Sequence, residues 1–175
     1  MTYVRPVFVL LVVVLSIVAG GSRAQNSPPQ HQHAAPNIID GAVHPELIPD
    51  STVWRLWLAL VSLSPNATEK ERTFQQAHLA TLQLTNADSV QLNTILTEFK
   101  DQYLALIARY NESAKAALLQ GGQPDRKLFL QQRDDIVSST RAAIAQQLTP
   151  HGATRIDAHV QEEKTHIRLT GVRGQ

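Results

Sequence analysis

The apolar positions of residues 85–120 recur in steps of three and four, the spacing that places side chains on one face of an α-helix. This stripe consists of Leu92, Leu96, Phe99, Tyr103, Leu106, Tyr110, Ala114 and Ala117. Ile95, Ile107 and Leu118 widen it beyond a coiled-coil seam, toward the broader face that a bundle helix buries. The pattern predicts one long amphipathic helix, which needs other helices to cover its stripe.

Further helices are predicted on both sides of this long one. They cover residues 50–62, 66–82, 125–148 and 150–166. Asp50 or Ser51 is expected to cap the first of them. Gly121 and Gly122 predict a short link that folds residues 125–148 back along the long helix. Because no alternating β-strand run is present, the predicted fold class is all-α, with about five helices and a long antiparallel helical hairpin within a small bundle.

The first residues have the pattern of an export signal. Residues 7–19 are almost continuously apolar, and the small residues Ser22 and Ala24 stand where a signal peptidase reads the chain. An uncleaved membrane anchor is the alternative, but the run is shorter than the ~20 residues that span a bilayer. We therefore predict a signal peptide over residues 1–24, export to the periplasm or the medium, and no stable membrane insertion after cleavage.

The remaining chain is predicted to divide into three parts. Residues 25–36 are polar and Pro-containing, which is typical of a disordered linker. Residues 37–167 form the all-helical domain, and residues 168–175 are expected to be a flexible tail. His31 and His33 lie in the linker, where they are either solvated or share a metal ion at the entropic cost of ordering the segment.

Charge and cysteine content exclude several classes of function. Removing residues 1–24 leaves 14 basic residues (16 − 2, the two being Arg5 and Arg23) against 15 acidic ones. A near-neutral chain without a Lys/Arg cluster argues against nucleic acid as a partner. The chain has no cysteine, so neither disulfides nor thiolate chemistry is available, and packing alone must hold the fold together.

The predicted helix over residues 50–62 is apolar nearly all round, so most of its sides must be covered. One interpretation makes it the central helix of the core. The other leaves one face exposed as a partner-binding surface, in which case Trp54 and Trp57 are its anchors.

Candidate metal ligands occur near the C-terminus. On a continuous helix His159, Glu163 and His166 share one face at i, i+4 and i+7, where they can hold a metal such as Zn²⁺. The alternative is an exposed polar face. His78 lies beside the apolar stripe of residues 66–82, where a lone histidine is more often a hydrogen-bonded packing residue than a ligand.

Signatures of catalysis are missing from the sequence. It contains no nucleophile-elbow motif, phosphate-binding loop, dinucleotide-binding glycine run or thiol. The sequence therefore predicts a protein that is not an enzyme, with no catalytic residues and no cofactor, Zn²⁺ being the alternative.

Two predicted helix starts match each other. Leu84-Thr85 is followed at offsets of eight and twelve residues by Leu92 and Leu96, and Leu148-Thr149 at the same offsets by Ile156 and Val160. The match suggests a common docking geometry. With these two Leu-Thr starts the chain resembles the LTxxQ-motif periplasmic helical proteins, the Spy-like and CpxP-like family. It departs from the motif at the Gln position, which holds Asp88 in the first copy and Gly152 in the second.

The resemblance implies elongated helical hairpins, often dimerised, and roles in ATP-independent chaperoning, envelope-stress signalling or metal binding. We therefore expect an exported non-enzymatic helical protein that binds other polypeptides, for example as a periplasmic chaperone or envelope-stress factor. The alternative is a metal-binding or metal-responsive envelope protein. The expected partners are polypeptide clients or a protein partner, with a homodimer as the arrangement that the family implies.

Overall fold

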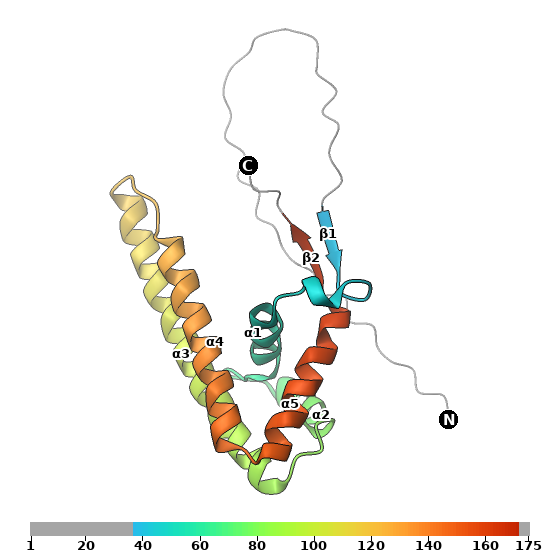
Figure 1. Ribbon diagram of the computed structural model, residues 1–175. Coiled ribbons are helices and arrows are strands. Elements are labelled where there is room, and N and C mark those ends of the chain that lie inside the picture. The colour runs from blue at the N-terminus through green and yellow to red at the C-terminus, as the bar shows by residue number, and fades with distance from the viewer. Residues whose placement is uncertain (1–36, 172–175) are drawn as a thin grey trace. The chain divides into compact units, whose positions relative to one another are not determined.

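Five α-helices and a two-stranded sheet make up residues 37–171, the part of the chain that the computed structural model describes (Figure 1). The helices are α1 (Asp50–Val61), α2 (Glu69–Ala80), α3 (Asn86–Leu119), α4 (Arg126–Gln147) and α5 (Pro150–Glu162). Two 3-10 helices flank them, η1 (Pro45–Leu47) before α1 and η2 (Glu163–His166) after α5. The predicted all-α fold with a long helical hairpin is confirmed. The predicted signal peptide, the linker, His31 and His33 lie outside the described residues.

Short polar side chains fix where four of the helices begin. At the start of α2, the Thr68 hydroxyl accepts from the Glu71 N–H at 3.3 Å and the Glu71 carboxylate accepts from the Thr68 N–H at 2.7 Å. This capping box satisfies donors that have no partner within the helix. Thr85, Asp125 and Thr149 cap α3, α4 and α5 by accepting one backbone N–H each with their side-chain oxygens. Local sequence therefore determines these boundaries.

The start of α1 differs from the prediction. The N-cap position is Pro49, with no side-chain hydrogen bond, so neither Asp50 nor Ser51 caps the helix. The Asp50 carboxylate instead pairs with the Lys164 ammonium of η2 at 2.5 Å and lies 3.9 Å from the Arg141 guanidinium of α4. Because cations of η2 and α4 engage the Asp50 carboxylate, it does not accept a hydrogen bond from the backbone N–H groups at the start of α1.

Helix α1 is the central element of the hydrophobic core and contacts each of the other four helices. Its buried residues are Val53, Trp54, Trp57, Leu58 and Val61. The residues that surround them in the core come from every side: Leu82, Leu92, Ile95, Leu96, Phe99, Val137, Ile144, Leu148, Ile156 and Val160. The prediction that a helix apolar nearly all round is covered on most sides is confirmed.

Helices α3 and α4 run side by side as an antiparallel hairpin (Figure 1). The turn between them uses Gly121, which has a φ of +72°, a left-handed conformation that glycine adopts without steric cost. The Gly122 N–H then donates to the Ala117 carbonyl at 2.9 Å and closes the end of α3. None of the helices in residues 37–171, α3 included, is long and apolar enough to cross a membrane.

The hydrophobic core covers only part of this hairpin. On α3 it extends as far as Tyr103, and on α4 it begins at Ile136. We call residues 104–135, which lie beyond these limits, the hairpin arm. Within the arm the two helices pack on each other, for example through Tyr110 and Phe129, whose ring centroids are 4.4 Å apart.

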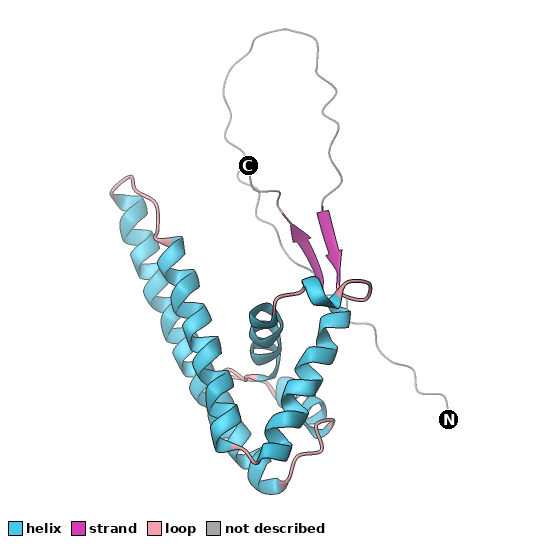
Figure 2. Cartoon of the chain, viewed as in Figure 1, coloured by secondary structure: helices cyan, strands magenta, loops and turns pink. Residues whose placement is uncertain are grey.

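A small sheet corrects the predicted ends of the domain (Figure 2). Strand β1 (Asn37–Asp40) pairs antiparallel with β2 (Arg168–Gly171), with Ile39 opposite Leu169. Both of these side chains pack against the core. Residues 37–167 are therefore not all helical, and the predicted flexible tail of residues 168–175 starts with a strand. Strands of four residues carry too little alternation to be recognised, and their partners are far apart in the sequence.

Candidate functional site

Trp54 and Trp57 are core residues. Each is only 2% exposed, and their rings meet edge to face with centroids 5.7 Å apart. The Arg141 guanidinium lies 5.3 Å from the centroid of the Trp54 ring, within cation–π range. The prediction that the two tryptophans anchor an exposed partner-binding face is therefore wrong. Packing the tryptophan face of α1 against the other helices buries more apolar area than leaving it in water.

Exposed leucines are concentrated on the hairpin arm. The four, which we call the arm leucines, are Leu104, Leu118, Leu119 and Leu128, at 38%, 66%, 83% and 49% exposed. Three of them are on α3 and Leu128 is on α4, and all four lie beyond the part of the hairpin that the hydrophobic core covers. Leu118, Leu119 and Leu128 lie near the turn of the hairpin, where their apolar side chains are available for contact with another molecule.

The charge of the arm is balanced. Its basic residues are Arg109, Lys115, Arg126, Lys127 and Arg133, and its acidic residues are Glu112, Asp125, Asp134 and Asp135, which gives 5 − 4 = +1. A nearly neutral surface with exposed leucines favours apolar contact with a polypeptide over binding of a polyanion.

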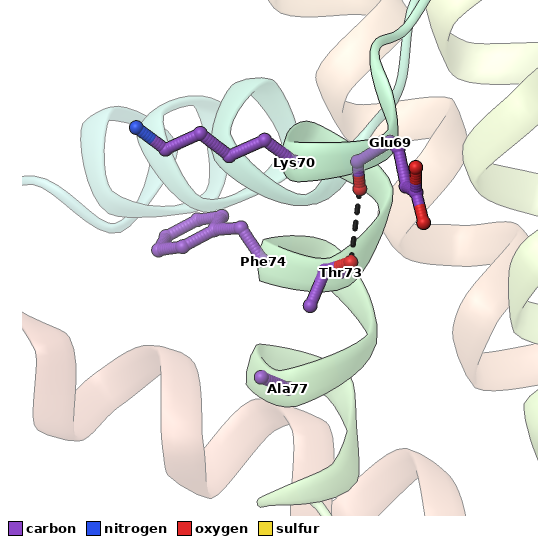
Figure 3. A pocket seen from close by; sticks show the side chains of 5 residues that line it. All are labelled: Glu69, Lys70, Thr73, Phe74 and Ala77. Atoms are coloured by element: carbon purple, nitrogen blue, oxygen red, sulfur yellow. Dashed lines mark hydrogen bonds between the residues drawn. The ribbon is translucent and has the colours of Figure 1, made fainter.

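Two shallow hollows of the described surface involve α2. The larger, about 550 Å³, is lined by Glu69, Lys70, Thr73, Phe74 and Ala77. Figure 3 shows Lys70 and Phe74 extending to one side of the helix and Glu69 to the other, so the acid and the base do not face each other. The Thr73 hydroxyl is used by its own helix, where it donates to the Glu69 carbonyl at 2.9 Å. A hollow lined by one helix lacks the converging polar groups of an enzyme pocket.

The smaller hollow, about 320 Å³, lies between α2 and the start of α3. Its lining residues are Gln75, Gln76, Leu79, Ala80, Gln83, Leu84, Ser89, Leu92 and Asn93. None of these side chains is an acid or a base near neutral pH, so this lining offers amide and hydroxyl groups for binding only. That the chain is not an enzyme stays a prediction.

The two Leu-Thr helix starts meet at one buried carboxylate. Asp88 is 3% exposed, and its Oδ1 accepts from the Thr149 N–H at 2.8 Å. Its Oδ2 accepts from the Thr149 hydroxyl at 2.7 Å and from the Thr85 hydroxyl at 3.0 Å. Thr85 and Thr149 in turn accept from the N–H groups of Asp88 and Gly152, both at 3.1 Å. We call these four residues the Asp88 clasp.

The clasp requires a glycine opposite the carboxylate. A Cβ at Gly152 would lie 2.7 Å from Asp88 Oδ2 and 2.9 Å from its Cγ, closer than such atoms approach. The pKa of Asp88 lies below its usual value, chiefly because the Thr149 N–H donates to the ionised form, with the Thr149 hydroxyl next. The two positions that depart from the LTxxQ motif are therefore in contact.

A pair of histidines links α2 to α5. His78 Nε2 lies 3.5 Å from His159 Nε2, and the ring centroids are 5.3 Å apart at an interplanar angle of 68°. Glu163 Oε1 lies 3.7 Å from the same His159 nitrogen. The pKa of His78 is lowered, chiefly by burial and then by His159, while Glu163 opposes the shift. Sequence reasoning placed His78 beside the apolar stripe but did not join it to a residue 81 positions away.

The predicted metal ligands are only partly brought together. His159 and Glu163 are close, but α5 ends at Glu162, and His166 lies at the end of the 3-10 helix η2, where it is exposed. Because a 3-10 helix turns more tightly than an α-helix, the assumed i+7 relation is lost. No group of three or more His, Asp or Glu side chains in the described residues has the geometry to hold a metal ion.

Comparisons of the chain with protein-family models, with curated proteins and with solved structures find no match. The resemblance to the LTxxQ-motif proteins therefore stays a prediction.

Proposed function

We propose that this chain is an exported, non-enzymatic protein that binds other polypeptides through the exposed apolar surface of its hairpin arm. The observation that carries the proposal is the position of the arm leucines, of which Leu118, Leu119 and Leu128 lie at the end of the hairpin beyond the hydrophobic core. A partly unfolded polypeptide exposes apolar side chains, and contact with these leucines removes both surfaces from water.

Two features of the arm support transient binding. The exposed apolar residues are few and are interspersed with charges of both signs, so the gain in free energy per client is small and clients can leave without ATP. The arm is also separate from the core, because α1 and the C-terminal half of α4 pack elsewhere. Binding there leaves the residues that stabilise the fold undisturbed.

The more specific form of the proposal rests on sequence. The N-terminal pattern supports export, and the resemblance to Spy-like and CpxP-like proteins supports a role as a periplasmic chaperone or envelope-stress factor. A homodimer is the arrangement that the resemblance implies.

The test is suppression of aggregation. The purified protein is mixed with reduced α-lactalbumin as a client, and light scattering is followed with and without EDTA. We expect the protein to slow aggregation equally in both conditions. The variant Leu118→Ser/Leu119→Ser/Leu128→Ser should lose most of this effect, since it removes the apolar contact but buries no new group.

The chain offers a matched control, Val43→Ser/Leu47→Ser/Val90→Ser, because these side chains are 66%, 53% and 69% exposed and lie outside the arm. It should suppress aggregation like the unchanged protein. Equal loss in both variants, or no loss in the arm variant, contradicts the proposal. Molar mass by light scattering is measured on the same samples. An arm variant that becomes monomeric but keeps full client binding assigns the arm to self-association instead.

The alternative, a metal-binding envelope protein, keeps one supporting observation in the facing imidazoles of His78 and His159.

A further inference from the structure

Arg55 of α1 is a half-buried cation without an acceptor. Its guanidinium makes no hydrogen bond and no ion pair with the residues that the structure describes, 37–171. We propose that this guanidinium, together with Arg133 of α4 and Tyr103 of α3, binds one small oxyanion, a phosphate or a carboxylate, at the base of the hairpin arm. The site shares no residue with the arm leucines and goes beyond the polypeptide-binding function.

Three helices bring these side chains to one place. On α4, Arg133 lies one helical turn before the buried Val137, so it belongs to the face of α4 that packs inward. On α3, Tyr103 lies one turn after the buried Phe99 and stacks on its ring, with the centroids 5.5 Å apart. Helix α1 contacts both α3 and α4, and Arg133 and Tyr103 both act electrostatically on Arg55. The three side chains therefore converge where the core ends and the arm begins.

The donors at this place outnumber their acceptors. Asp134 Oδ1 accepts from Arg133 Nε at 2.9 Å and from its Nη2 at 2.7 Å, which leaves the Nη1 group of Arg133 for another acceptor. The Asp134 side chain is 52% exposed and does not bond to Arg55. All the N–H donors of the Arg55 guanidinium are therefore without an acceptor in the described residues. The Tyr103 hydroxyl likewise makes no hydrogen bond there and can donate to a ligand.

The electrostatics favour an anion between the two arginines. Burial, with Arg133 next, lowers the pKa of Arg55, while Tyr103 and Asp134 oppose the shift. A guanidinium nevertheless stays charged near neutral pH. Removing a charge from water without a partner costs free energy, and so does holding two like charges close together. An oxyanion offsets both costs, because its paired oxygens match the forked N–H donors of a guanidinium. The balanced charge of the rest of the arm limits the site to a single anion.

The test is thermal unfolding of the purified protein at pH 7 in sodium phosphate, sodium acetate and sodium chloride of equal ionic strength. An anion that binds only the folded state raises the midpoint, by roughly 3–6 °C at a free concentration of ten times its Kd. We expect a saturating rise over chloride in phosphate, in acetate or in both. A rise in phosphate alone identifies a phosphate ligand, and a rise in acetate alone identifies a carboxylate. Equal midpoints in the three salts overturn the proposal.

Two variants that each remove one positive charge separate this site from the general stabilising effect of such salts. Arg55→Met should abolish the rise. Arg109→Met should keep it, because Arg109 is an exposed residue elsewhere on the hairpin arm. In chloride, Arg55→Met should unfold at the same temperature as the unchanged protein or higher, since an apolar side chain replaces an unpaired half-buried charge. A rise of equal size in both variants is a general salt effect and refutes the site.

A second readout uses the unchanged protein and covers the case in which Arg55→Met does not fold. In an NMR titration with phosphate or acetate, the Nε–H signals of Arg55 and Arg133 should shift and saturate at the same anion concentration. The Nε–H signal of Arg109 should not saturate with them. If neither anion produces a saturating shift at Arg55, the proposal is wrong.

Discussion

The contact between Gly152 and Asp88 gives a prediction whose sign depends on one other residue. In a helix, Gly→Ala normally stabilises a protein by up to about 1 kcal/mol, since alanine loses less backbone entropy on folding. At position 152 the new methyl group would stand 2.7 Å from Asp88 Oδ2. We therefore expect Gly152→Ala to destabilise the protein.

The size of this destabilisation depends on how far the Asp88 carboxylate can move away from the new methyl group. Asp88 is held by the Thr149 N–H and by the hydroxyls of Thr85 and Thr149, so its carboxylate cannot retreat without lengthening those hydrogen bonds. Overpacking of this kind costs about 1–3 kcal/mol. Set against the helix propensity of alanine, Gly152→Ala should lower the free energy of unfolding by roughly 0–2 kcal/mol.

The same substitution should have the opposite sign in an Asp88→Ala background. The two atoms nearest to the new methyl group are then gone, and the next nearest, the Thr149 hydroxyl oxygen, is 3.3 Å away. Gly152→Ala should now raise the free energy of unfolding by up to about 1 kcal/mol. Urea unfolding of the four proteins in this double-mutant cycle gives both values, provided that the m-value is unchanged.

Gly122→Ala is the matched control, because a Cβ there meets only the Ala117 carbonyl at 3.4 Å, an ordinary contact. Its effect should be the same with and without Asp88→Ala. If Gly152→Ala has the same sign in both backgrounds, the close contact does not exist in solution and the clasp is wrong as described.

Two further predictions concern the acid dependence of stability and the difference in stability between the core and the hairpin arm. Because the folded-state pKa of Asp88 is lowered, its contribution to stability is present above its unfolded pKa of about 3.9 and is lost as pH falls through the lowered value. Asp88→Asn should therefore lower the urea midpoint at pH 7 and flatten its fall between pH 5 and pH 3. An unchanged acid slope contradicts this assignment. Separately, Ile156→Ala should cost about 2–5 kcal/mol in urea unfolding because Ile156 is fully buried, whereas Phe129→Ala in the arm should cost less and mainly speed amide exchange there. Equal costs would mean that the arm is part of the core.

The sequence predicts where the helices lie along the chain, but it does not predict which helices pack against each other. Residues 85–120 were recognised because their apolar stripe extends over many turns, and Thr85 and Thr149 marked helix starts through local hydrogen bonding. Trp54 was ambiguous, because an apolar side chain on an all-round apolar helix fits a core and a binding face equally well. Only the packing of α3, α4 and α5 around α1 decides it.

The remaining misses all involve contacts between residues distant in sequence. Strand β2 pairs with a segment about as far away as the domain allows, and His78 meets His159 across 81 positions. Nothing in the local pattern of either segment specifies its partner. The spacing of His159 and His166 places them on one face only if a single helix continues, whereas the chain tightens into η2 after Glu162.

The Asp88 clasp joins the two positions at which the chain departs from the LTxxQ motif. In the sequence, Asp88 and Gly152 are two separate mismatches with the motif glutamine. In the structure they are one arrangement, because the carboxylate that reaches Thr149 occupies the space that any side chain at position 152 would need. A glutamine at position 152 is therefore incompatible with Asp88 as placed. The two mismatches are physically coupled, because the carboxylate at position 88 requires a residue without a side chain at position 152.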